Sequence, residues 1–266
     1  IRVGTEYAVR NAGNGVFAMK FYSFKAAAAV TALAGSLAMT GAASAGPLSI
    51  SSVNGGAPGG VILDNLDWLT TNGLDAAPNT TGGLSPQSGM SVSFSPDGGA
   101  VEGNVSGINA APFLSGNNGQ GFGNPFPGND QPNGQDTTVY VTAGGIQGSS
   151  VTFLLPSDER YFGLLWGSVD TYNTLEFFDN NTLIGSITGS DVTAFANGDQ
   201  GAAGTFYVNI TSTTAFNRVV ATSSQHAFEI DNISFNPTVP SPEPITLSLF
   251  GAGLAGLGLA RRRRKA

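Results

Sequence analysis

Short segments in which apolar and polar side chains alternate run through residues 46–240, and Gly, Asn, Asp and Pro separate them at short intervals. A period of two predicts strands with one buried face, and the turn residues between them predict antiparallel neighbours. No part of this region carries a convincing helical period. The predicted strands are residues 48–53, 90–95, 100–105, 137–143, 150–155, 161–169, 174–178, 182–188, 206–211, 217–222 and 228–235. The pattern predicts a single antiparallel β-sandwich, jelly-roll-like, in which two sheets bury one core.

Two connections between these strands have a distinct composition. Asp179-Asn180-Asn181 predicts a tight hairpin turn, because Asn and Asp tolerate a positive φ. Residues 115–136 are rich in Gly, Asn, Pro, Gln and Asp, with only Phe122 and Phe126 as apolar interruptions, which predicts a long loop that is either mobile or packed through these two rings. Carbonyl groups of the Asn and Asp residues in this loop could bind calcium, but the spacing of an EF-hand is missing, so we favour a mobile or packed loop over a metal site.

Three features follow one another at the end of the chain. Pro242, Glu243 and Pro244 come first, an uncharged apolar run covers residues 245–260, and Arg261, Arg262, Arg263, Arg264 and Lys265 follow. The prolines favour an extended, accessible backbone. The run would form a helix of about 24 Å, which is shorter than the ~20 residues that span a bilayer comfortably. We therefore expect marginal membrane insertion, with the basic cluster on the cytoplasmic side.

This arrangement resembles the PEP-CTERM sorting signal, in which a Pro-Glu-Pro motif precedes a short Gly- and Leu-rich helix and an arginine-rich end. The resemblance implies that a membrane enzyme, exosortase, recognises and removes the tail after transient insertion of the helix into the inner membrane. It also implies a Gram-negative bacterium that makes exopolysaccharide and lives in biofilms. An ordinary tail-anchor helix is the alternative, and the short apolar run argues against it.

The front of the chain has the organisation of a secretory signal peptide. Met19-Lys20 and Lys25 form a basic start, residues 26–39 are apolar, and Ala43-Ser44-Ala45 is a small-residue cleavage site. We expect export by the Sec machinery and cleavage after Ala45, and the flanks of the apolar run argue against a buried helix. The expected segments are an upstream extension or misassigned start (1–18), the signal peptide (19–45), the exported domain (46–240) and the sorting segment (241–266).

Charge and cysteine content exclude several function classes for the exported domain. It contains two basic residues, Arg160 and Arg218, against sixteen acidic ones, which gives a net charge of −14, whereas the whole chain carries −7. Such a surface repels phosphate, so nucleic acid is not an expected partner. Cysteine is absent, which excludes thiol catalysis and cysteine metal sites. We expect no cofactor, although the acidic character leaves calcium possible.

Residues 161–178 combine aromatic and polar side chains in a way that stands out from the rest of the domain. They resemble a block with a W-G-S-x-D-x-Y-N signature found in a group of PEP-CTERM surface proteins. In this chain the block consists of Trp166, Gly167, Ser168, Asp170, Tyr172 and Asn173. The resemblance alone implies no activity.

Two interpretations of this block are open. Asp170 and Asn173 could fix a corner between two strands by bonding nearby backbone amides. Alternatively, Trp166 or Tyr172 could offer an apolar face to a sugar ring while Asp170 and Asn173 bond its hydroxyl groups. Trp166 has apolar neighbours and could equally belong to the core. These four residues are the candidate ligand-binding residues.

Residues 228–235 resemble the closing strand of many extracellular carbohydrate-binding sandwiches. Asp231 and Asn232 are adjacent on this predicted strand. Regular alternation turns adjacent side chains to opposite faces, so we expect at most one of them to join a given site.

Residues suited to catalysis are sparse. The only histidine, His226, is close in sequence to Ser223 and Ser224, whereas a catalytic base and nucleophile must converge in space. Glycosidases need two carboxyl groups across a cleft, and the spacing of Glu102, Glu159, Glu176 and Glu229 selects no pair. We therefore expect a non-catalytic protein of the cell surface or extracellular matrix, processed by exosortase and associated with exopolysaccharide. A lectin-like carbohydrate-binding module is the alternative main activity, and a glycoside or ester hydrolase is less favoured.

Overall fold

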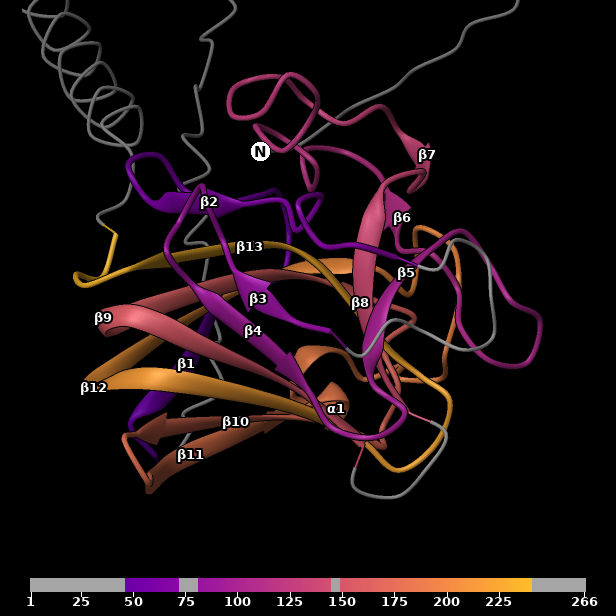
Figure 1. Ribbon diagram of the computed structural model, residues 1–266. Helices are drawn as coiled ribbons and strands as arrows, with labels where there is room; N and C mark the ends of the chain where they lie inside the picture. Colours follow the sequence, from indigo (N-terminus) through magenta and orange to yellow (C-terminus); the bar gives the residue numbers. More distant parts are fainter. Residues whose placement is uncertain (1–45, 72–80, 145–148, 241–266) are drawn as a thin grey trace, which may run out of the picture. The chain divides into compact units, whose positions relative to one another are not determined.

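The computed structural model describes residues 46–71, 81–144 and 149–240 (Figure 1). The predicted signal peptide and sorting segment lie outside these residues. The described residues form thirteen strands and one short helix. In chain order they are β1 (Leu48–Ser52), β2 (Ile62–Asp64), β3 (Gly83–Leu84), β4 (Ser91–Phe94), β5 (Gly99–Glu102), β6 (Phe113–Leu114), β7 (Gly134–Gln135), β8 (Val139–Ala143), β9 (Ser149–Gly167), β10 (Asn173–Asp179), β11 (Thr182–Thr188), α1 (Gly189–Val192), β12 (Phe206–Ser223) and β13 (Phe228–Asn236).

Most strands belong to one antiparallel sheet with the order β11-β10-β12-β9-β13-β8-β5. Further strands extend it, because β1 pairs with β12, β2 with β13, β4 with β9 and β3 with β4. Strands β6 and β7 form a separate pair. The expected all-β, antiparallel architecture is confirmed, and the sheet is open rather than closed on itself.

Strands β9 and β12 pair with each other over most of their length but have different neighbours at their two ends. At one end, β4 pairs with residues 151–154 of β9, and β10 pairs with residues 218–223 of β12. At the other end, β13 pairs with residues 161–167 of β9, and β1 pairs with residues 209–212 of β12. The long pair therefore joins two groups of strands, one with β4 and β10 and the other with β13 and β1.

This continuity corrects the predicted strand boundaries. Four segments that were predicted as separate strands are two, because residues 150–155 and 161–169 belong largely to β9, and residues 206–211 and 217–222 belong to β12. Pro156 and the charged residues 158–160 interrupt the alternation, which is why the sequence predicts a break there. In the structure Glu159 pairs with Phe216 of β12, and shifts of register beside this pair absorb the irregularity.

Aromatic side chains from both groups of strands meet in the core. The ring of Phe162 lies 6.0 Å from that of Phe153 and 5.9 Å from that of Phe177, measured between ring centroids. Trp166 is fully buried and stacks on Phe228 with the ring centroids 4.4 Å apart. Buried rings of this size contribute a large share of the apolar area that stabilises a domain.

The long loop of residues 115–136 packs against the sheet. Phe122 is fully buried, and its ring centroid lies 5.9 Å from that of Tyr207 on β12. These two rings form a second apolar cluster with Leu114 and Leu165, and Phe126 packs against it. The two phenylalanines thus anchor the loop.

The predicted hairpin is confirmed. Asp179 at the end of β10 pairs with Thr182 at the start of β11, which leaves Asn180 and Asn181 as the turn. Asn180 has a φ of +53°, a conformation that Asn adopts more readily than most residues.

Replacing Trp166 by Ala is expected to lower the free energy of unfolding by about 3–5 kcal/mol, because the surrounding core can fill only part of the cavity that the indole leaves. The matched control is Leu154→Ala on the same strand, where the side chain is 51% exposed. Urea unfolding followed by circular dichroism measures both variants. A W166A variant as stable as L154A would contradict the core position of Trp166.

Candidate functional site

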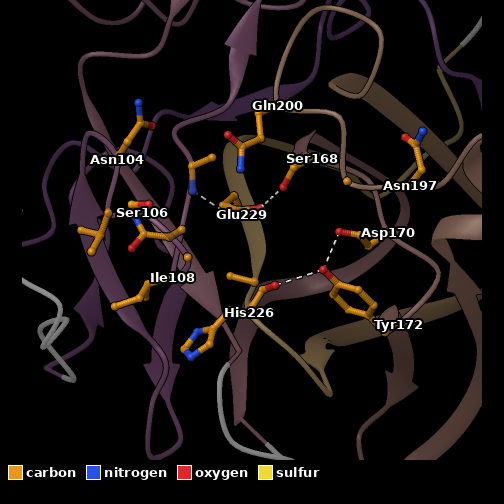
Figure 2. Close-up of a pocket in the computed structure, with 16 residues that line it drawn as sticks. Asn104, Ser106, Ile108, Ser168, Asp170, Tyr172, Asn197, Gln200, His226 and Glu229 are labelled. Atoms are coloured by element: carbon orange, nitrogen blue, oxygen red, sulfur yellow. Dashed lines mark hydrogen bonds between the residues drawn. The ribbon is translucent and has the colours of Figure 1, made fainter.

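A pocket of about 590 Å³ opens where the corner after β9, the start of β13 and two loops meet (Figure 2). Its lining comes from residues 104–110, from Ser168, Asp170 and Tyr172, from Asn197, Gly198 and Gln200, and from His226, Ala227 and Glu229. These segments are far apart in the sequence. The pocket therefore depends on the fold and not on one local motif.

Backbone contacts hold the corner that forms one wall. Ser168 directly follows β9 and has a φ of +34°. The amide of Val169 donates to the carbonyl of Gly204 at 2.9 Å, and the amide of Asn173 donates to the carbonyl of Asp170 at 3.2 Å. The corner is thereby tied to the neighbouring loop and closed on itself.

Asp170 and Tyr172 form a bonded pair on this wall (Figure 2). The Tyr172 hydroxyl lies 2.5 Å from Asp170 Oδ2 and 3.0 Å from the backbone oxygen of His226, and donates towards both. Burial, followed by the neighbouring Asp170 carboxylate, raises the pKa of Tyr172 above its ordinary value. Gly198 leaves room for the pair, because a Cβ atom there would lie 2.6 Å from Asp170 Oδ2.

The other two candidate residues are not in the pocket. Trp166 belongs to the core, which is the alternative that the sequence leaves open. Asn173 is fully buried, where its Oδ1 accepts from the Ser223 hydroxyl at 3.0 Å and its Nδ2 donates to the Ala227 carbonyl at 3.4 Å. Asn173 thus links β10 to the end of β12 and to the segment before β13.

Glu229 on β13 forms the floor of the pocket and is only 2% exposed. The Ser168 hydroxyl donates to its Oε2, and the Ala110 amide donates to its Oε1 at 2.9 Å. Burial raises the pKa of Glu229 from 4.5 to about 8; the two donors oppose this rise and the Asp170 carboxylate adds to it. Glu229 is therefore mostly neutral at pH 7.

Glu229 is not among the ligand-binding residues predicted from the sequence. It is one of four glutamates whose spacing selects no catalytic pair. The number of residues between Asp170 and Glu229 does not indicate that they share a site. Asp170 lies on the corner after β9 and Glu229 lies on β13, and only the fold brings them to one pocket. The available signal was a single acidic residue between Phe228 and Ile230, both of which are buried. An acid between two core residues of a strand indicates either a buried polar network or a site.

The side chains of the pocket are suited to a ligand with many hydroxyl groups. Carboxyl, amide and hydroxyl groups supply donors and acceptors, while Val105 and Ile108 add apolar surface. None of the described residues that line the pocket is Lys or Arg. Ser223 does not line the pocket, and its hydroxyl lies 3.0 Å from Asn173 Oδ1 and 2.7 Å from the Gln225 carbonyl oxygen.

Within the part of the chain that the structure describes, no helix is long and apolar enough to cross a membrane. The apolar run at residues 245–260 lies outside that part.

A family model of the PEP-CTERM protein-sorting motif matches residues 242–265. The match includes Pro242, Glu243 and Pro244 together with the four arginines 261–264, and it does not extend to the block at residues 166–173. No curated protein and no solved structure matches the chain. The motif implies a protein that is exported, processed by exosortase and sorted to the cell surface.

Proposed function

We propose that this protein is a non-catalytic component of the cell surface or extracellular matrix that binds the exopolysaccharide of its own biofilm. The sorting motif supports surface delivery. The observation that carries the binding proposal is the pocket in which Asp170, Tyr172 and Glu229 converge. In this proposal the Sec machinery exports a precursor of a Gram-negative bacterium, and residues 245–260 hold it transiently in the inner membrane before exosortase acts. The exported domain is a β-sandwich of jelly-roll type.

The chemistry of the lining favours a carbohydrate. Sugar hydroxyl groups both donate and accept hydrogen bonds, so they are matched by a mixture of carboxylate, amide and hydroxyl groups. Asp170 supplies acceptors, and Gln200 and Asn197 supply both donors and acceptors. The pocket volume of about 590 Å³ lies within the usual range of small-molecule pockets, about 300–1,000 Å³. A pocket of this volume can hold about one or two sugar rings.

The charge of the domain favours a neutral polysaccharide over an acidic one. Sixteen acidic residues against two arginines give the domain a negative charge, and the lining within the described residues offers no Lys or Arg to attract a carboxylate or sulfate group. Glu229 adds little charge at pH 7 because its pKa is raised. We therefore propose a neutral exopolysaccharide as the ligand.

One observation favours a second candidate, a glycoside hydrolase. Asp170 and Glu229 line the same pocket, and a carboxyl group with a raised pKa is a typical general acid. Both oxygens of Glu229, however, already accept bonds from Ser168 and Ala110, and the group is almost fully shielded. These contacts leave it poorly placed to deliver a proton to a ligand, so binding remains our proposal. Release of reducing ends by the wild type, lost in E229Q, would favour the hydrolase instead.

Asp170→Asn is expected to weaken binding to the host exopolysaccharide about tenfold or more, because it replaces charge-assisted hydrogen bonds by neutral ones. Co-sedimentation of the exported protein with the polysaccharide measures this. The matched control is Asp179→Asn at the β10–β11 turn, outside the pocket, which should bind like the wild type. Equal binding by both variants would exclude the pocket as the binding site.

Glu229→Gln is expected to change the pH dependence of stability. The folded state holds a proton on Glu229 up to about pH 8, whereas the unfolded chain loses it near pH 4.5, so the wild type loses stability as pH rises through this window. Gln cannot titrate, so E229Q does not lose this stability. The free energy of unfolding of E229Q minus that of the wild type should therefore increase from pH 5 to pH 8 and then level off. Urea unfolding at intervals from pH 5 to 9 measures it, with Glu176→Gln on β10 as the control. A constant difference across this range would refute the raised pKa.

Glu243→Ala, or deletion of residues 261–265, is expected to leave an unprocessed precursor in the membrane fraction of the native host, because each change removes one feature of the matched motif. Immunoblots of cell fractions compare precursor and mature forms. Ser241→Ala, directly before the motif, is the control and should mature normally. Normal maturation of all variants would argue against exosortase processing.

A further inference from the structure

The pairing along one edge of β13 is interrupted at Asp231 and Asn232. Residues 228–230 pair with β8, and residues 233–235 pair with β2 on the same edge. Asp231 and Asn232 lie between these two ladders. The segment after β2 and the segment before β8 both reach this gap, because they continue the strands on either side of it.

A β-bulge brings Asp231 and Asn232 together. Against β9, Asp231 pairs with Leu165 and Ser234 with Gly163, so β13 advances three residues while β9 advances two. Asn232 accordingly has a φ of +53°. Regular alternation would turn these neighbours to opposite faces, and this prediction fails because the extra residue of the bulge breaks the alternation between Asp231 and Ser234.

The side chains that fill the gap form one hydrogen-bonded group. Asp136 Oδ1 accepts from the amide and from the hydroxyl of Thr138, at 2.9 and 2.7 Å. The same hydroxyl accepts from Gln131 Nε2 at 3.1 Å, and Gln131 Oε1 accepts from Asn232 Nδ2. The Asp136 and Asp231 carboxyl groups are in hydrogen-bonding contact, which two acids can make only with a shared proton or a bridging cation. Burial is the largest cause that raises the pKa of Asp231, Asp136 adds to the rise, and the Asn232 backbone amide opposes it.

With both carboxyl groups ionised, four oxygens in this group lack a hydrogen-bond donor in good geometry. They are Asp136 Oδ2, Asp231 Oδ1, Asp231 Oδ2 and Asn232 Oδ1, and they make up four of the six buried, unpartnered side-chain atoms in the described residues. Asp231 and Asn232 are fully buried and Asp136 is 2% exposed. Unpaired carboxylate oxygens in such surroundings cost several kcal/mol by general estimates unless a cation or proton compensates them.

The basic residues of the described chain do not supply this compensation. Arg160 donates to the Thr213 carbonyl, and Arg218 donates to the Asn180 carbonyl and lies over the Phe178 ring. Both are engaged elsewhere in the fold. The region from residue 46 to residue 240 contains no lysine.

We propose that Asp136, Asp231 and Asn232 bind a calcium ion between β13 and the segment that precedes β8. The donors are all oxygens of carboxylate and amide groups, which hard divalent cations prefer, and two carboxylates balance the charge of the ion. Calcium suits the site better than magnesium, because it accepts irregular sets of six to eight oxygens, whereas magnesium requires a near-ideal octahedron.

Asp67 stays outside the proposed ligand set. Its Oδ1 accepts from the Val139 amide at 3.2 Å, and its Oδ2 accepts from Asn65 Nδ2 at 2.6 Å. Its negative charge nevertheless acts on Asp231. In the described residues no group of three His, Cys, Asp or Glu side chains is arranged to hold a metal, so the site depends on the Asn232 amide oxygen beside two carboxylates.

Thermal unfolding of the full-length protein in calcium, magnesium and EDTA tests this proposal. At a calcium concentration about tenfold above Kd, the Tm should rise by about 3–6 °C, with a smaller rise in magnesium. Isothermal titration of EDTA-treated protein should give one calcium site, with a Kd of about 10⁻⁴–10⁻³ M, typical of extracellular modules.

Asp231→Asn should abolish the calcium-dependent rise in Tm, and its Tm in EDTA should equal or exceed that of the wild type, because a neutral amide replaces a buried carboxyl group that needs a proton or a cation. Asp136→Asn should also lose the calcium effect. The matched control is Glu159→Gln, another fully buried carboxyl with an unpartnered oxygen, which lies where β9 pairs with Phe216 and should keep the full calcium effect. Equal Tm values of the wild type in calcium and EDTA with no titration heat, or a full calcium effect in D231N, would overturn the proposal.

Discussion

The pairing of β9 with β12 is the constraint on which the other features depend. This pair continues through both groups of strands. The last residues of β9 pair with β13, whereas the first residues of β10 pair with the far end of β12. The chain from Gly167 to Asn173 must therefore cross from one group to the other. The pocket lies over this crossing, and the polar residues of the corner line it.

Scarcity of positive charge shapes the way in which the domain accommodates its buried acids. Asp64 is fully buried and accepts bonds from the Leu66 amide, the Trp68 indole and the Ser88 hydroxyl. Glu229 likewise has a donor for each oxygen. Asp231 instead lies against the Asp136 carboxyl, and neither of its oxygens has a donor in good geometry among the described residues. Neutral hydrogen-bond donors thus stabilise the buried carboxyl groups of Asp64 and Glu229. The buried carboxyl group of Asp231 must be stabilised in another way.

The parts of this structure that depend on local pattern could be predicted, whereas those that depend on long-range contacts could not. Alternation located most strands, and the turn at Asn180 follows from residue type. The sequence could predict that Asp170 and Tyr172 share one site, because both residues lie on the same corner after β9. The joining of Glu229 to that site, and the bulge at Asn232, arise from pairing between distant strands, which alternation does not encode. The continuity of β9 past Pro156 likewise depends on its partner strand.

Strand β13 has a mechanical consequence for a protein displayed at a cell surface. It begins at the pocket with Phe228 and Glu229 and ends at Asn236, a few residues before the sorting motif. A force applied between the pocket and the end of the domain would therefore run along the strand axis, while the hydrogen bonds to β9, β8 and β2 lie across that axis. Bonds in this orientation are loaded in shear and must yield together, whereas the bonds of a hairpin pulled open from one end yield one after another. The arrangement connects the pocket stiffly to the end of the domain that precedes the sorting motif.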